Sequence, residues 1–167
     1  MSSLREERAQ DAEPLRLLIA SAFGRDAEAR LVERLRAADK VKLSMVAEDK
    51  NRVLGHVLFS EIFVGTDEPA LALAPLSVMP AYQRLGLGSA LVSAGLQRLN
   101  GGGISRVLVL GDPDYYARFG FVPASRFGVR CPFPAPEEAF MAFELEPGAF
   151  KGCAGVARYG HEFEDLG

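Results

Sequence analysis

Several features that would assign this chain to a common functional class are missing from its sequence. Basic residues are not in surplus, because 19 lysines and arginines are set against 22 acidic residues, for a formal charge of −3. Proteins that bind nucleic acids usually carry a basic surplus, so a nucleic-acid partner is not expected. A small phosphate ligand stays open, since a few backbone donors are enough to bind one.

Cysteine and histidine are also scarce. The two cysteines, Cys131 and Cys153, match no metal or redox spacing, so we expect reduced thiols. His56 alternates with apolar residues and is expected to be a structural histidine. No His/Cys/Asp/Glu cluster has metal-ligand spacing and no Ser-His-Asp pattern stands out, so no metal site is expected.

Long apolar segments are also missing from the sequence. The first residues contain no apolar run of ~7–15 residues of the kind found in secretory signals. No stretch approaches the ~18–20 residues that span a bilayer, so we expect a cytoplasmic protein without a membrane partner. With 167 residues, 49% of them hydrophobic and 25% charged, the chain fits one globular domain with a substantial core.

The hydrophobic pattern predicts an α/β fold with a mixed, twisted sheet of six to seven strands flanked by helices. Helices are expected at about 11–24, 26–39, 86–100 and 113–120, and strands at about 3–8, 42–48, 52–64, 70–79, 104–110, 121–130 and 139–146. Strand 70–79 is apolar on both faces, which is typical of a central strand. Pro75 interrupts it, because proline has no N–H for a sheet ladder. The glycine-rich residues 147–167 are expected to lie over the surface.

A glycine-containing segment follows that central strand. Gly86 and Gly88 stand where the strand gives way to the next helix, and the unpaired N–H groups of a helix start can bind a pyrophosphate. A purely structural turn is the alternative. The segment is not a P-loop, because no lysine follows Gly88, and it lacks the third glycine of the dinucleotide fingerprint.

Two motifs in this order resemble the GNAT superfamily of N-acetyltransferases. The first is Val78-Met79-Pro80 followed by Gln83, Arg84, Gly86 and Gly88, and the second is Tyr116 four residues before Gly120-Phe121. Within the superfamily the chain is similar to the YhbS-like bacterial branch, from about residue 4 to 163. The resemblance implies a GNAT domain over 1–147, with 148–167 as its C-terminal tail.

The resemblance also implies how the cofactor is held. Acetyl-CoA would be the acyl donor, with its pantetheine arm entering where strands 70–79 and 104–110 splay apart and pairing with strand backbone. The residues expected to contact the cofactor are Leu76, Ser77, Val78, Gln83, Arg84, Leu85, Gly86, Leu87, Gly88, Ser89 and Tyr115.

Catalysis needs a base for the amine and a proton for the departing thiolate. Tyr116 matches the general-acid position of the family, although both adjacent tyrosines could simply pack in the core or on the cofactor. Many members carry a glutamate on the central strand, but strand 70–79 has no acidic residue. Glu61 is the best substitute, because it alternates with Val57, Phe59 and Phe63. A solvated edge carboxylate, or water as the base, is the alternative.

The expected function is therefore acetyl transfer from acetyl-CoA to a primary amine of a small molecule or protein. A non-catalytic acyl-CoA-binding sensor with the same fold is the alternative, and an enzyme for a longer acyl chain is a variant of the first. No motif identifies the acceptor, and a homodimer is left open.

Overall fold

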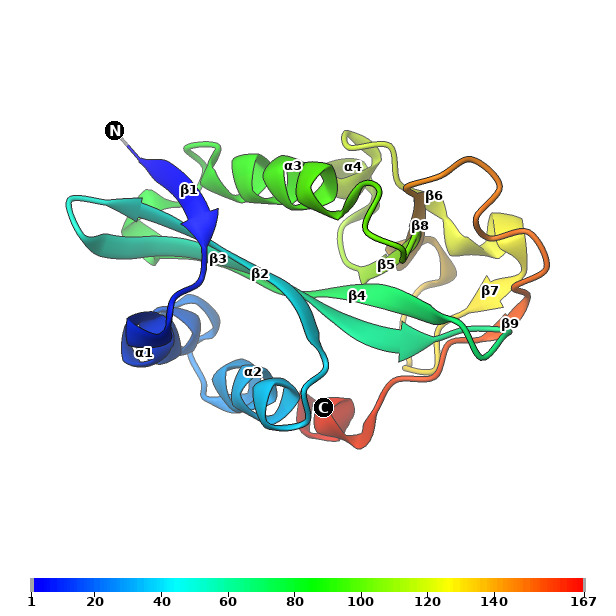
Figure 1. Ribbon diagram of the computed structural model, residues 1–167, viewed down its shortest axis with the longest axis horizontal. Helices are drawn as coiled ribbons and strands as arrows, with labels where there is room; N and C mark the ends of the chain where they lie inside the picture. Colours follow the sequence, from blue (N-terminus) through cyan, green and yellow to red (C-terminus); the bar gives the residue numbers. More distant parts are fainter. Residues whose placement is uncertain (1, 167) are drawn as a thin grey trace. The chain divides into compact units, whose positions relative to one another are not determined.

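Figure 1 shows the computed structural model, which describes residues 2–166. The chain forms two compact units. The first holds the residues up to Ser60, Ala74–Gln97 and the residues from His161 onward, and the second holds Glu61–Leu73 and Arg98–Gly160. No described helix is long and apolar enough to cross a membrane.

Unit 1 is built on antiparallel strands. β1 (Ser3–Glu6) pairs with β2 (Val41–Asp49), and β2 pairs with β3 (Arg52–Phe63). The last residues of β4 (Pro69–Val78) follow β3 in the hydrogen-bonded order. The predicted hairpin of residues 42–64 and the short first strand are both present.

Three helices cover this part of the sheet. α1 (Ala12–Phe23) and α2 (Ala27–Ala37) lie on one face of β2 and β3, and α3 (Leu87–Leu99) lies on the other (Figure 1). α1 ends where Gly24 adopts a left-handed conformation and its N–H bonds to the carbonyl of Ala20. The helices pack through apolar stripes, with Leu15, Leu18, Ile19, Leu31, Val32 and Leu35 all buried. Phe23, which the apolar pattern places on the same face of α1, is exposed at the end of that helix.

α3 approaches the sheet closely because it carries a glycine at the contact. A Cβ atom added to Gly95 would lie 2.5 Å from Cε1 of Phe59, which is fully buried on β3. Carbon atoms normally pack at about 3.5–4.0 Å. The glycine therefore leaves the space that the phenyl ring of Phe59 fills.

Unit 2 contains both parallel and antiparallel pairs. The first residues of β4 run parallel to β5 (Arg106–Leu110), which pairs antiparallel with β8 (Phe140–Glu144), and β8 pairs with β6 (Val122–Pro123). The full strand order is β1-β2-β3-β4-β5-β8-β6, so the predicted mixed sheet of seven strands is confirmed. A separate parallel pair joins β7 (Val129–Arg130) to β9 (Gly155–Val156).

Two predictions need correction. The strand expected at 121–130 is two short strands, β6 and β7, separated by a 3-10 turn at Ala124–Phe127 that ends at a left-handed Gly128. Residues 147–167 were expected at the surface, yet Phe150, Cys153 and Phe163 are buried. Burying these apolar side chains is favourable, so the segment packs against the protein although it is rich in glycine.

The short helices complete the element list. α4 (Pro113–Ala117) follows β5, and 3-10 turns occupy Ala9–Asp11, Pro80–Tyr82, Glu137–Ala139 and His161–Leu166. Asp112 caps α4, because its Oδ1 accepts a hydrogen bond from the Asp114 N–H at 3.0 Å. The helix expected from residue 113 is therefore present, and it is shorter than the predicted range of 113–120.

Candidate active site

Within the part of the chain that the structure describes, no strand is paired with one backbone edge of the last residues of β4. The Met79 N–H donates to the Leu54 carbonyl at 2.8 Å, so this end of β4 is held by β3. Successive strand residues direct their backbone groups to opposite edges. The groups of Leu76 and Val78 therefore point away from β3. Among the described residues, the ladder between β4 and β5 ends at Ala72. The splay of the two strands beyond it stays a prediction.

Part of that open edge is occupied by a side chain. The amide Nε2 of Gln83 donates to the carbonyl of Val78 at 3.0 Å. This bond folds the segment after β4 back against the strand end. The side chain of Ser77 is buried, and its hydroxyl has no hydrogen-bond partner in the part of the chain that the structure describes. Leu76, Ser77 and Val78 thus lie on the predicted strand, and the Val78 carbonyl is already bonded.

The loop after Gln83 is shaped by two residues with positive φ. Arg84 has φ +66° and Gly86 has φ +90°, and both are exposed. No atom lies within 4 Å of a Cβ built on Gly86, so the space beside its backbone is open. The Gly86 carbonyl accepts the first bond of α3 from the Ala90 N–H at 3.0 Å. The loop therefore leads directly into a helix start, where backbone N–H groups point outward and favour an anion.

The predicted general acid lies in unit 2 on α4. The Tyr116 side chain is 8% exposed, and its ring packs edge-on against Phe121 with centroids 5.6 Å apart. Burial, and secondarily the neighbouring Tyr115, raise the pKa of Tyr116 above the ordinary range. The phenol therefore stays protonated at neutral pH and can act as a donor. The ring of Tyr115 stands edge-on to that of Tyr116 at 5.0 Å and lies under the guanidinium of Arg118.

The predicted base, Glu61, lies on β3 in unit 2 and is half-buried. The apolar wall expected beside it is incomplete, because Phe59 is fully buried whereas Phe63 is 37% exposed. β4 itself contains no acidic residue. Glu61 therefore keeps partial access to water.

Comparison with known proteins decides the family. Residues 6–121 match the model of the acetyltransferase (GNAT) family, which is more than half of the chain. The chain belongs to this family. It is 39% identical over 155 residues to the uncharacterized N-acetyltransferase YhbS of Escherichia coli K12, covering 92% of this chain and 93% of YhbS. It is 40% identical over 134 residues to the uncharacterized N-acetyltransferase YjhQ of the same strain, covering 77% and 74%.

Solved structures agree with this membership. The structure of E. coli YhbS in complex with CoA matches with a TM-score of 0.94 and 38% identity, covering 99% of this chain and 93% of that one. A GNAT acetyltransferase from Brucella melitensis in complex with acetyl-CoA matches with a TM-score of 0.81 and 34% identity, covering 98% of each chain. The sequence resemblance to this superfamily and to its YhbS-like branch is thereby confirmed.

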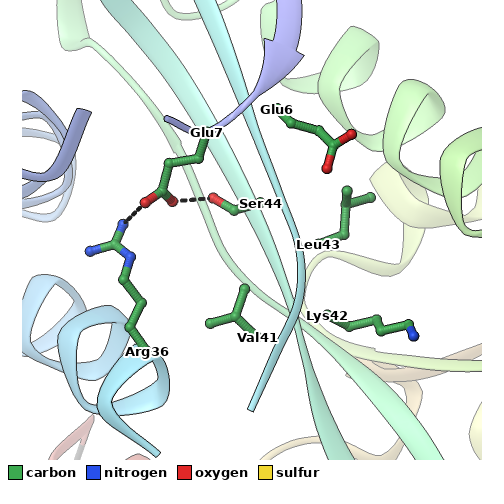
Figure 2. Close-up of a pocket in the computed structure, with 7 residues that line it drawn as sticks. All are labelled: Glu6, Glu7, Arg36, Val41, Lys42, Leu43 and Ser44. Atoms are coloured by element: carbon green, nitrogen blue, oxygen red, sulfur yellow. Dashed lines mark hydrogen bonds and ion pairs between the residues drawn. The ribbon is translucent and has the colours of Figure 1, made fainter. Parts of the chain in front are cut away.

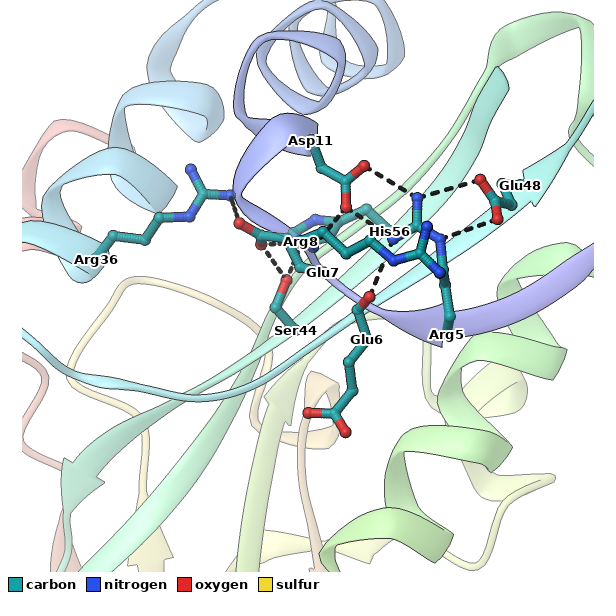
Figure 3. Close-up of polar contacts among 9 residues, drawn as sticks. All are labelled: Arg5, Glu6, Glu7, Arg8, Asp11, Arg36, Ser44, Glu48 and His56. Carbon is teal, nitrogen blue, oxygen red and sulfur yellow. Dashed lines mark hydrogen bonds and ion pairs between the residues drawn. The ribbon is translucent and has the colours of Figure 1, made fainter. Parts of the chain in front are cut away.

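The acetyltransferase also contains a polar cluster that the sequence does not predict (Figure 3). The Ser44 hydroxyl donates to the Glu7 carboxylate at 2.5 Å and lies 2.8 Å from Nε2 of His56. Glu7 also forms an ion pair with Arg36 at 2.8 Å. Because Ser44 donates its proton to Glu7, His56 is the donor in its contact with Ser44, and its other ring nitrogen, Nδ1, has no partner among the described residues.

His56 is fully buried, as a structural histidine should be. Burial is the main cause that lowers its pKa to about 3, and the nearby positive charge of Arg36 adds to it. The cluster borders a pocket of about 280 Å³ lined by Glu6, Glu7, Arg36, Val41, Lys42, Leu43 and Ser44 (Figure 2). Within the pocket wall, Glu7, Ser44 and Arg36 are bonded to one another or to His56, so these groups stabilise the packing of β1, β2 and α2.

Proposed function

We propose that this acetyltransferase uses acetyl-CoA to acetylate a primary amine of a small molecule or protein. The observation that carries the proposal is the exposed loop Gln83–Gly86, which leads into the N-terminus of α3 directly after an edge of β4 that no described strand pairs with. The complexes of YhbS with CoA and of the Brucella protein with acetyl-CoA support the same ligand.

In this proposal the backbone of Leu76 and the Val78 N–H pair with the pantetheine arm. The segment Gln83 to Ser89 binds the pyrophosphate, and Tyr115 contributes to cofactor packing. Because Gln83 already bonds to the Val78 carbonyl, we assign it the role of holding the loop against the strand. Residues 1–147 then constitute the acetyltransferase domain, residues 148–167 its tail, and the cytoplasm its place of action.

The reaction is a direct transfer. The neutral amine nitrogen attacks the thioester carbon, a C–N bond forms and the C–S bond breaks. Tyr116 gives its proton to the departing thiolate, and the amine loses a proton to Glu61 or to water. A general acid of this kind contributes about 10²- to 10⁴-fold to the rate.

A second candidate is a non-catalytic acyl-CoA-binding protein. It is favoured by one observation, the absence of an acidic residue from β4. An assay of free thiol release from acetyl-CoA over a panel of alkylamines, polyamines and peptide amines separates the two. Amine-dependent release supports the enzyme. Tight CoA binding by calorimetry, with no release above the uncatalysed rate for any amine, supports the binding protein.

A further inference from the structure

Gly111 connects β5 to the capping residue of α4, and its backbone does not require glycine. Its φ lies outside the left-handed region, and its N–H is bonded to the carbonyl of Ala139 at 2.9 Å. An alanine could adopt the same backbone conformation without strain. The reason for a glycine must therefore be the space beside it.

That space is filled by the ring of Tyr116. A Cβ atom added to Gly111 would lie 2.5 Å from Cε2, 3.1 Å from Cδ2 and 3.6 Å from Cζ of Tyr116. The first two distances are shorter than the usual carbon–carbon contact of about 3.5–4.0 Å. The bare backbone of Gly111 is thus packed against the ring edge that leads to the hydroxyl-bearing carbon.

Other aromatic rings limit how the Tyr116 ring can move. Tyr115 stands edge-on at 5.0 Å between centroids, and Phe121 stands edge-on at 5.6 Å. Phe121 is itself buried and packs against Phe143 at 5.3 Å. A ring pushed away from Gly111 would have to displace these neighbours or turn, and either movement carries the hydroxyl with it.

We propose that Gly111 is a positioning residue for Tyr116, setting the place of the phenol that protonates the leaving thiolate. The inference rests on the proposed function of Tyr116. Misplacing a reacting group by about 1 Å can cost on the order of 10²-fold in rate. Gly111→Ala should accordingly lower kcat about 10- to 100-fold while leaving KM for acetyl-CoA nearly unchanged.

The experiment is a double-mutant cycle on the full chain, with kcat and KM measured under conditions where chemistry limits turnover. Its members are the parent, Gly111→Ala, Tyr116→Phe and the double variant. If Gly111 acts through the Tyr116 hydroxyl, the double variant should have the kcat of Tyr116→Phe alone, because the group being positioned has already been removed.

Gly95→Ala is the matched control. Its added Cβ would also lie 2.5 Å from an aromatic ring carbon, that of Phe59, and Gly95 belongs to unit 1 whereas Tyr116 belongs to unit 2. It should lower the melting temperature and keep the parent kcat at a temperature where the variant is folded. Any change that Gly95→Ala causes in kcat should multiply with that of Tyr116→Phe when the two substitutions are combined.

The outcomes separate the two hypotheses. If Tyr116→Phe keeps parental turnover, the general-acid role fails, and with it the positioning role. If Tyr116→Phe is impaired but Gly111→Ala is not, or if the two losses multiply in the double variant, only the positioning role fails. An equal loss of kcat in Gly95→Ala would assign the effect to general loss of packing and would likewise overturn the inference.

Discussion

At the scale of single residues, Glu61 is the position where a role in catalysis can be tested most directly. It is half-buried on β3, beside the fully buried Ser60 and Ile62. If Glu61 accepts the amine proton, Glu61→Gln should abolish or shift the acidic limb of the pH profile of kcat/KM for an alkylamine. The substitution keeps the shape of the side chain and removes the titrating carboxyl. An acceptor that is neutral at working pH, such as an aromatic amine, should be largely spared.

Glu68→Gln is the control for this experiment. Glu68 belongs to the same unit and is paired with Arg106, but its side chain is 77% exposed. Its substitution should leave the profile unchanged. If Glu61→Gln also leaves the alkylamine profile unchanged, water is the proton acceptor and Glu61 is a surface carboxylate.

Some site residues follow from local sequence and others do not. Tyr116 and the Gly120-Phe121 pair lie within six residues, so the resemblance to the family motif can be recognised from a short stretch of sequence. The role of Gly111 cannot be predicted from local sequence, because it depends on where the Tyr116 ring packs. The bond from Gln83 to the Val78 carbonyl is likewise visible only once the loop is folded.

At the scale of elements, the loop and the helix start that follows it should behave as one anion-binding unit. Gly86→Asp places a negative charge where the proposed pyrophosphate approaches, at a backbone φ of +90°. We expect CoA affinity measured by calorimetry to fall by about one to two orders of magnitude, since two unit charges at about 4 Å repel by about 1–4 kcal/mol in water or near a protein surface.

Gly86→Asn separates charge from conformation. Asparagine has nearly the shape of aspartate and tolerates positive φ, so the neutral variant should bind CoA more tightly than the aspartate variant. Gly88→Asp should weaken binding as Gly86→Asp does. Unchanged affinity in both aspartate variants, with circular dichroism and melting temperature preserved, would contradict the assignment of the loop.

Helices and strands with a long apolar pattern are predicted well from sequence. Segments whose strand boundaries depend on turns are not. α1, α2 and the long strand β3, which is buried continuously over its middle, are found close to their expected ranges. The segment 121–130 breaks into two short strands because Pro123 cannot donate to a ladder and Gly128 adopts φ +71°. The composition of residues 121–130 indicates one strand, but the turn between Pro123 and Gly128 divides it into two.

At the scale of the whole molecule, the buried His56 should make stability depend on pH. Its folded pKa of about 3 lies below the value of 6.5 for an exposed histidine. The unfolded chain therefore binds a proton at His56 below about pH 6.5 while the folded chain does not, so the free energy of unfolding falls as the pH drops from 6.5 toward 3. The slope is at most about 1.4 kcal/mol per pH unit, so the loss between pH 6.5 and 4.5 is on the order of 2 kcal/mol.

Urea denaturation at pH 7, 5.5 and 4.5 measures this slope. His56→Gln should be less stable at pH 7, since it alters the contact with Ser44, but its stability should fall less over this range. His161→Gln, at a side chain that is 80% exposed, should keep the parental slope. Arg5 lowers the pKa of Asp11 and of Glu48, so these carboxylates lose their contribution at still lower pH. Equal slopes in parent and His56→Gln would contradict the prediction.

The polar cluster around His56 is a feature of the whole molecule that the sequence does not predict. Its contacts join residues far apart in the chain, as Figure 3 shows for Glu7, Arg36, Ser44 and His56. Arg5 pairs with both Asp11 and Glu48 in the same way. Ligand-binding loops can be recognised from motif spacing, because their residues are close together in the sequence. Bonds between distant segments cannot, because they form only when the chain has folded.

The bond between Gln83 and the Val78 carbonyl also bears on self-association. A strand edge that can accept a small molecule can equally accept a strand of another polypeptide, and open edges are common starting points for aggregation. A foreign strand needs a continuous row of donors and acceptors. Near the end of β4 that row is interrupted, because the Val78 carbonyl is already bonded to Gln83. An added strand would therefore find one acceptor fewer at this end of β4, because the Gln83 amide already occupies it.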